Sequence, residues 1–358
     1  MDSTVTKPKR KRISLALQGG GALGAYTWGA LDRLLEDERI EISAISGTSA
    51  GAMCAVVLAD GLAEGGAEGA RKQLRQFWEG VARAGNSNPY RRTPTMAFLG
   101  AFMPAWAQEN IALWADATSR LASPYDFNPL NVNPLKDVLE ELVDFERVRG
   151  CKALEIFIGA TNVETGRVQV FSKPELTADH VLASACLPQL FKAVIIDGTP
   201  YWDGGYTGNP ALFPLFDVKA TNDIVIVQIH PIEREGAPRA ASAINARVNE
   251  INFNASLLAE LRAIEFVGRL LDESRLPEGR YRKMLIHNLS EAQALTPLGI
   301  GVDLNTDLSF FNTLFDTGRA AAERWLGEHF DALGERSTVD LGAMFRDAPK
   351  GGEAKPLR

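Results

Sequence analysis

Two short apolar stretches near the start of the chain each lead directly into a cluster of glycines and other small residues. Residues 13–17 precede Gly19-Gly20-Gly21, and residues 40–46 precede Gly47-Thr48-Ser49-Ala50-Gly51. After the first cluster, apolar residues recur at the three- and four-residue steps of a helix, and a small-residue helix is expected after the second. Two strand–turn–helix units in succession are typical of a layered α/β fold. The opening 60 residues therefore predict a mostly parallel central sheet flanked by helices.

The rest of the chain supplies further candidate elements. Helices are predicted over residues 22–36, 52–59, 62–85, 240–273 and 307–330, with a stop at Asp60-Gly61 between the second and third. Strands are predicted over residues 155–160, 167–171, 224–229 and 282–286. Residues 86–134 are rich in proline and in large apolar side chains, which favours an inserted helical cap. Six of those side chains are candidates for an acyl groove or a lipid contact: Met96, Phe98, Leu99, Phe102, Met103 and Trp106.

Composition excludes several classes of protein. Asp and Glu number 45 against 38 Lys and Arg, so the net charge of −7 argues against a general nucleic-acid binder. The three cysteines, Cys54, Cys151 and Cys186, are odd in number and lie among apolar neighbours. They favour a reducing compartment over a disulfide framework. The sequence contains no Cys or Cys/His spacing typical of a metal site, so no metal is expected.

The N-terminus carries a basic run followed by only five apolar residues, ISLAL. A secretory signal needs roughly 7–15 apolar residues at this point, so we expect none. The basic run is interpreted as a solvated tail or as a weak contact with anionic lipid. No uninterrupted apolar run reaches the roughly 18 residues of a membrane span. The expectation is a cytoplasmic protein that meets membranes or lipid surfaces peripherally, if at all.

A serine occupies the centre of the second glycine turn. The sequence from Gly47 to Gly51 fits the G-x-S-x-G nucleophile elbow, in which glycines let the strand and helix backbones approach closely. The motif is common by chance, but its position between an apolar strand and an apolar helix is the required context. A serine at a helix N-terminus also lies where the helix dipole favours developing negative charge. Ser49 is therefore the candidate nucleophile, and the alternative is an ordinary turn of small residues.

The first glycine cluster supports two different functions. Its backbone N–H groups are candidates for an oxyanion hole, in which each donor contributes roughly 10²–10³ to the rate. The same residues also spell the G-x-G-x-x-G of dinucleotide sites. Such a site requires an acidic residue about 20 positions on, at the end of the second strand. That strand ends in Ser46-Gly47-Thr48-Ser49 instead, which disfavours a nucleotide-binding oxidoreductase.

A nucleophilic serine needs a base, and the residues alone leave two choices open. His230 and His287 each end a strand-like segment, where the histidine of a catalytic triad would lie. Asp203 is followed by two glycines. Glycines favour a turn and allow the backbone of another segment to approach it closely. A Ser–His–Asp triad and a Ser–Asp dyad are both compatible with this pattern.

Taken together, these segments resemble the patatin-like phospholipase family. QGGGALG at residues 18–24 is similar to the family's oxyanion loop, GTSAG at 47–51 to its nucleophile elbow, and Asp203-Gly204-Gly205 to its aspartate motif. Residues 183–209 are similar to the family's stretch around that aspartate, and the whole resemblance covers about residues 12–230. Many members carry Arg or Lys near the end of the glycine loop, where this chain has Leu23. This difference affects only the role that the Arg or Lys side chain would have, because the oxyanion donors are backbone groups.

The resemblance implies a three-layer sandwich and a dyad in which Asp203 accepts the proton of Ser49, which attacks an acyl ester. The other implied site residues are the loop residues Gly19, Gly20, Gly21, Ala22 and Gly24, the elbow residues Gly47, Thr48, Ala50 and Gly51, and Gly204 and Gly205. No cofactor or metal is implied. The substrate is a lipid or another acyl ester, and a catalytically idle lipid-binding module of the same fold is the main alternative.

The expected organisation has three parts. A basic tail spans residues 1–12. A patatin-like catalytic domain spans 13–230 and carries the insertion at 86–134. A helix-rich region spans 231–358 and packs on the same domain.

Overall fold

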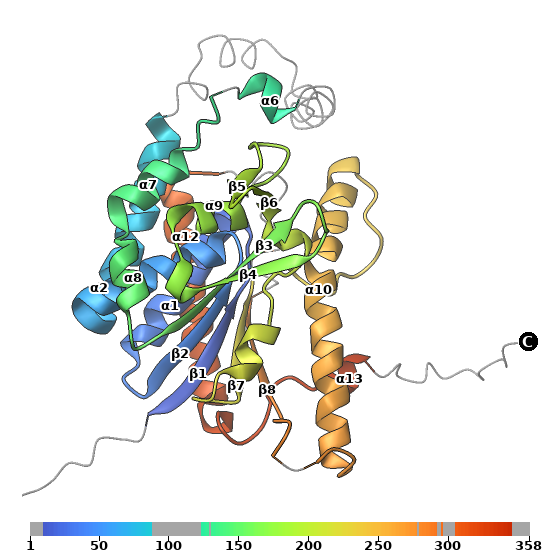
Figure 1. Cartoon of the computed structure of the whole chain (residues 1–358). Helices are drawn as coiled ribbons and strands as arrows, with labels where there is room; N and C mark the ends of the chain where they lie inside the picture. Colours follow the sequence, from blue (N-terminus) through green and yellow to red (C-terminus); the bar gives the residue numbers. More distant parts are fainter. Residues whose placement is uncertain are drawn as a thin grey trace, which may run out of the picture.

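An eight-stranded sheet forms the centre of the molecule (Figure 1). The computed structural model describes residues 10–87, 123–128, 130–277, 279–291, 295 and 305–345. The strands are β1 (Lys11–Leu17), β2 (Ile40–Gly47), β3 (Glu155–Asn162), β4 (Val168–Ser172), β5 (Val194–Ile196), β6 (Thr199–Asp203), β7 (Asp223–Gln228) and β8 (Leu285–Ser290). The path across the sheet is β5-β6-β3-β2-β1-β7-β8, and β4 pairs with β3.

Five neighbouring strands, β3, β2, β1, β7 and β8, are mutually parallel. β4 and β6 run antiparallel to β3, and β5 runs antiparallel to β6. The predicted α/β fold with a mostly parallel sheet is confirmed. Because parallel strands end at the same edge, the residues that follow β1, β2 and β7 meet there.

Helices cover both faces of the sheet. They are α1 (Gly24–Glu36), α2 (Ala50–Ser87), α6 (Pro124–Phe127), α7 (Pro134–Leu142), α8 (Phe145–Gly150), α9 (Ala178–Ser184), α10 (Ala241–Asp272), α12 (Leu308–His329) and α13 (Leu341–Phe345). Short 3₁₀ turns lie at η1 (Gly21–Leu23), η3 (Lys173–Glu175), η4 (Gly204–Tyr206), η5 (Phe213–Asp217) and η8 (Phe330–Ala332). Figure 1 shows α1, α2 and α12 on one side of the sheet and α10 and α13 on the other.

Strand alternation divides the core between these two layers. Leu15 and Leu17 of β1 pack with the buried side chains of α1, α2 and α12. Ala16, between them in sequence, belongs to a second cluster with Leu257 and Leu261 of α10. Successive side chains of a strand point to opposite faces, so one strand supplies both cores. The three-layer arrangement follows from this alternation.

Two glycines allow α12 to lie directly against α1. A Cβ added at Gly29 would lie 2.0 Å from the carbonyl oxygen of Phe315, and one added at Gly318 would lie 2.0 Å from that of Tyr26. The backbones therefore touch where the helices cross. Elements after residue 230 thus contribute to the same sheet and the same core, through β8 and α12.

The element α2 is a helix that turns back on itself. Gly65 and Gly66 are not helical, and Gly66 has φ +64°. The side chain of Gln73 donates a 2.7 Å hydrogen bond to Asp60, although thirteen residues of straight helix would separate them by about 20 Å. The predicted stop at Asp60-Gly61 is therefore wrong by about five residues. Asp60 is buried inside the reversal, where Arg147 also bonds it.

By length and composition, α2 is also the one helix in the described ranges that would suffice to cross a membrane. Inside the fold, 67% of its apolar window is buried, as in the core helix of a globular domain. The six apolar side chains predicted for an acyl groove in the insertion, and residues 1–9 of the basic tail, lie outside the described residues.

Candidate active site

Ser49 lies in the tight turn between β2 and α2. Its φ of +53° places it in the left-handed region, which a serine adopts only when its surroundings impose it. A Cβ at Gly47 would lie 2.6 Å from the Gly51 carbonyl oxygen, and one at Gly51 would lie 2.3 Å from that of Leu17. The close backbone approach expected of a nucleophile elbow is therefore present, and both glycines are sterically required.

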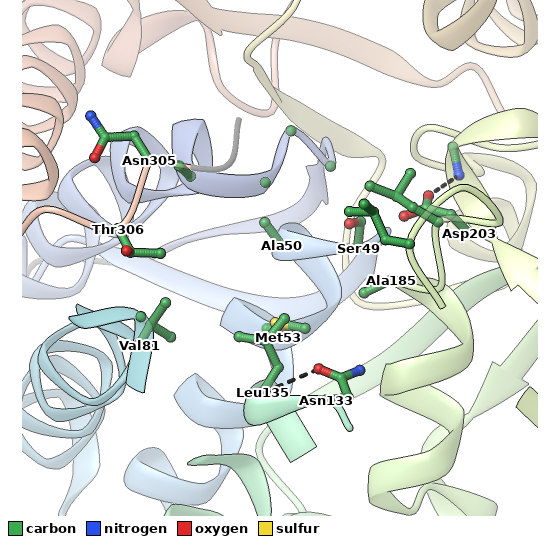
Figure 2. A pocket seen from close by; sticks show the side chains of 18 of the residues that line it. Ser49, Ala50, Met53, Val81, Asn133, Leu135, Ala185, Asp203, Asn305 and Thr306 are labelled. Atoms are coloured by element: carbon green, nitrogen blue, oxygen red, sulfur yellow. Dashed lines mark hydrogen bonds between the residues drawn. The ribbon is translucent and has the colours of Figure 1, made fainter. Parts of the chain in front are cut away.

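Asp203 ends β6 and lies beside Ser49 (Figure 2). β6 pairs with β3, next to β2 in the sheet, which brings residues 154 positions apart into contact. The carboxylate is 3% exposed and accepts a 2.7 Å hydrogen bond from the Gly205 N–H. Burial raises the pKa of Asp203 to about 7, against the opposing effects of the Gly205 N–H and of a hydrogen bond with the Ser49 side chain. The two predicted catalytic side chains are thus brought together.

A second serine supports the elbow. The Ser49 N–H donates a 2.9 Å hydrogen bond to Ser184 Oγ, and that hydroxyl donates to the Gly159 carbonyl oxygen at 2.6 Å. This chain of two bonds ties the nucleophile's backbone to β3. Sequence analysis did not assign Ser184 this role, because nothing local relates α9 to the elbow.

The glycine loop wraps over the turn, but its predicted donors are not equivalent. The Gly19 N–H donates to Asn209 Oδ1 at 2.7 Å, and the Gly24 N–H donates to the carbonyl oxygens of Gly21 and Ala22. These two groups are engaged within the protein and are not available to a substrate. In the described part of the chain, the N–H groups of Gly20, Gly21 and Ala22 donate to no other group. They are the remaining candidates for an oxyanion hole.

The four histidines lie in different surroundings, and two of them have structural positions that do not suit a catalytic base. His180 caps its own helix through Thr177, and His329 lies at the end of α12. His287 is fully buried on β8, where Nε2 contacts Asp223 Oδ1 at 2.9 Å and Nδ1 contacts Thr338 Oγ1 at 3.2 Å. Only His230 lines the cavity that contains Ser49.

We therefore expect His287→Phe to affect stability and not catalysis. Removing the imidazole takes one hydrogen bond from the buried Asp223 carboxylate, which keeps those from Gly334 and Thr221, and should lower the free energy of unfolding by about 2 kcal/mol. The kcat of the folded variant should remain within about threefold of wild type, because the residue is outside the cavity. Denaturant unfolding and ester hydrolysis on the same sample measure both quantities. A loss of kcat of about a thousandfold would instead indicate a triad.

A cavity of about 330 Å³ extends from Ser49. Its polar side chains include Ser49, Asp203, Asn209 and His230, together with Asn133, Asn305 and Thr306. Its walls are mainly apolar and include Met53, Phe77, Trp78, Val81, Leu135, Leu187, Leu190, Phe191, Phe253 and Phe311. Figure 2 shows Val81, Asn305 and Thr306 at the end away from Ser49 and Asp203. No group of three His, Cys, Asp or Glu among the described residues is placed to hold a metal.

Ser49 thus lies on a strand–helix elbow beside a buried carboxylate and backbone N–H groups without a partner in the described residues, as the sequence predicted for a candidate nucleophile. The family model described as Patatin-like phospholipase matches residues 15–216, more than half of the chain. The chain belongs to the patatin-like phospholipase family, as its motifs predicted.

Two solved structures resemble the chain at low sequence identity. VipD from Legionella pneumophila is 17% identical, with a TM-score of 0.42, over 90% of this chain and 68% of that one. ExoU from the type III secretion system of Pseudomonas aeruginosa, solved in complex with SpcU, is 15% identical, with a TM-score of 0.28. This match covers 88% of this chain and 70% of the ExoU chain. No curated protein matches the sequence of this chain. The family assignment therefore rests on the match over residues 15–216.

Proposed function

We propose that this protein is a lipid acyl hydrolase, a carboxylic ester hydrolase of the phospholipase A or lysophospholipase type. The observation that supports this most directly is that Ser49 lies beside the buried Asp203 in a mainly apolar cavity of about 330 Å³. A mainly apolar cavity with Ser49 at one end suits a fatty acyl chain whose ester carbonyl lies at Ser49.

The mechanism follows from the positions of these groups. Ionised Asp203 accepts the proton of Ser49 as the Oγ attacks the ester carbonyl carbon. The Gly20, Gly21 and Ala22 N–H groups stabilise the oxyanion that forms. The alcohol leaves with a proton returned by Asp203, and water then releases the fatty acid from the acyl-serine through the same two steps. All four histidines are dispensable as proton acceptors in this scheme.

The experiment that tests this function is the release of fatty acid from short- and long-chain esters and from phosphatidylcholine vesicles. Wild type should be active, and a fluorophosphonate should label Ser49. Wild type that hydrolyses none of these esters, and whose Ser49 is not labelled, would favour the idle lipid-binding module instead.

Activity should depend on pH through Asp203. Only the ionised carboxylate accepts a proton, and burial raises the pKa of Asp203 to about 7. We therefore expect kcat/KM to fall about tenfold per pH unit below pH 7 and to level off above it. Rates measured from pH 5 to 9 with an uncharged ester check this. A plateau that extends down to pH 5 would contradict it.

Val81 should limit the length of the acyl chain. It lies on the returning arm of α2, at the end of the cavity away from Ser49 (Figure 2). Val81→Phe should fill space that the end of a long chain occupies, and each displaced methylene costs about 0.8 kcal/mol. Loss of three methylene contacts should lower kcat/KM for a long-chain ester by roughly 10²-fold and leave a butyrate ester unchanged.

The matched control is Val248→Phe, which adds the same ring on the exposed face of α10. This variant should keep the wild-type chain-length profile. Equal profiles for Val81→Phe and wild type would show that the acyl chain binds elsewhere.

We further propose that the protein is cytoplasmic and reaches its lipid or acyl-ester substrate by binding peripherally to a lipid surface. The apolar cavity supports contact with lipid, and the basic run at residues 7–12 of the sequence supports contact with an anionic surface. Cell fractionation with and without a carbonate wash tests it, because a peripheral protein is released by the wash.

A further inference from the structure

The ring of His230 bonds the backbone of the glycine loop. His230 Nε2 lies 3.0 Å from the carbonyl oxygen of Gly19. A carbonyl oxygen only accepts, so Nε2 must carry the proton and donate. The residue is 8% exposed, and burial lowers its pKa, which favours the neutral ring; the bond to Gly19 then places the proton of that ring on Nε2. A proton held in this way is not available for exchange with Ser49.

This bond fixes the direction of a neighbouring N–H group. The Gly19 carbonyl and the Gly20 N–H belong to one planar trans peptide, in which they point in opposite directions. When His230 holds the oxygen, the Gly20 N–H is directed away from His230 and cannot rotate freely. A hydrogen bond to the oxygen also polarises the peptide and strengthens its N–H as a donor.

The loop at this point is in direct contact with the nucleophile. A Cβ added at Gly19 would lie 2.7 Å from Ser49 Cβ. The preceding peptide is also held, because the Gly19 N–H donates to Asn209 Oδ1 at 2.7 Å. Both peptides that flank Gly19 are thus anchored by side chains, and the Gly20 N–H remains without a partner in the described part of the chain.

His230 is itself held by a buried polar network. Gln18 Oε1 accepts the N–H groups of Ile229 and His230 at 2.8 and 3.0 Å. Gln18 Nε2 donates to the Asn209 carbonyl oxygen and to Asn254 Oδ1. The His230 ring packs on Phe253, 5.6 Å between centroids. Gln18 and Asn254 are both buried, so the network leaves the imidazole little freedom.

We propose that His230 is a positioning residue that orients the Gly20 N–H as an oxyanion donor. The inference rests on the proposed ester hydrolysis, and it gives His230 a role that differs from that of a triad base. His230, Phe253 and Asn254 all lie beyond residues 15–216, the part of the chain that matches the family. The donor geometry of the glycine loop therefore depends on residues outside the matched region.

The test compares two substitutions that differ in their ability to donate. His230→Phe keeps a ring against Phe253 but removes the donor, and kcat should fall roughly 10²-fold with little change in KM, as for loss of one oxyanion donor. His230→Gln places an amide N–H near the position of Nε2 and should recover kcat to within about tenfold of wild type. The fall in rate below pH 7, the acidic limb of the pH profile, should persist in His230→Gln, because it reports the ionisation of Asp203.

His287→Phe is the matched control, since it removes another buried histidine outside the cavity. Thermal unfolding of each variant gives its folded fraction, and kcat is calculated per folded molecule. If His230→Phe retains wild-type kcat, or if Gln and Phe are equally impaired, the positioning role is wrong. Disappearance of the acidic limb in His230→Gln would make His230 the base and would also overturn the inference.

The failure of this inference is distinguishable from failure of the proposed function. Wild type without hydrolytic activity contradicts the function, and the inference with it. Active wild type with an equally active His230→Phe contradicts the inference alone.

Discussion

Ser49→Ala should lower kcat for ester hydrolysis by roughly 10⁴-fold or more, the scale of nucleophile removal in serine hydrolases. The Oγ forms the bond to the acyl carbon in the proposed mechanism, and water bound in its place has no equivalent activation. Fluorophosphonate labelling should be lost together with fatty-acid release. Wild-type rates in the variant would show that another residue is the nucleophile.

Two further substitutions separate chemistry from folding at this position. Ser49→Gly removes the same hydroxyl, but glycine adopts a φ of +53° without the cost that L-residues incur, on the order of 1 kcal/mol. It should be as inactive as Ser49→Ala and more stable in thermal unfolding. Ser14→Ala changes a buried serine on β1 whose hydroxyl has no partner in the described part of the structure. It should keep full activity.

Asp203→Asn should lower kcat by roughly 10⁴-fold, the scale at which loss of the carboxylate impairs a Ser–His–Asp triad. Asparagine has the shape of the aspartate and still offers an oxygen to the Gly205 N–H, so the turn at η4 should persist. The amide cannot accept the proton of Ser49, and the acidic limb of the rate profile should disappear from the residual activity. Rates within tenfold of wild type would exclude Asp203 as the base.

The same substitution should stabilise the fold at alkaline pH. The pKa of Asp203 rises from an ordinary 3.8 to about 7 in the folded protein, so the folded state binds more protons than the unfolded state between these values. Wild-type stability should therefore fall as pH rises from 4 to 7, by up to about 4 kcal/mol, and then level off.

Asp203→Asn should lack this decline and exceed wild type in stability at pH 8. Asp197→Asn, which removes an exposed carboxylate in the turn before β6, should show the wild-type dependence. Denaturant unfolding at pH 5 and pH 8 compares the three proteins. A pH dependence of Asp203→Asn equal to wild type would contradict this account.

The features that sequence analysis predicted well are those set by neighbours along the chain. The elbow around Ser49 and the turn after β1 follow from small residues placed between an apolar strand and an apolar helix. The long helix α10 and the antiparallel pair β3–β4 also follow from local periodicity and turn residues. These patterns place the nucleophile and the loop at one edge of the sheet before any tertiary contact is known.

The features that it missed depend on contacts between distant segments. The helix was expected to end at Asp60-Gly61, but Asp60 is stabilised inside the reversal by Gln73 and by Arg147, which lies 87 residues later. Roles for Ser184 and Asn209 were likewise invisible, since each acts on a backbone group of another element. Hydrophobic periodicity predicts which face of an element is buried, but it does not predict which distant residue will bond to it.

The choice between Asp203 and a histidine shows the same limit. Both residue types occur at suitable strand ends, and spacing alone could not rank them. In the structure Asp203 lies beside Ser49, whereas His230 and His287 each bond another group, and this difference supports the proposal that Asp203 is the base.

The reversal of α2 has a thermodynamic consequence for ligand binding. Its two arms supply Met53 and Val81 to the lining of the cavity, and the Asp60–Gln73 bond fixes the arms where they join. In the proposed function this part of the acyl-chain site is preorganised, so ordering of the two arms does not oppose binding. Calorimetry of a non-hydrolysable acyl analogue should therefore show a negative heat-capacity change that scales with chain length.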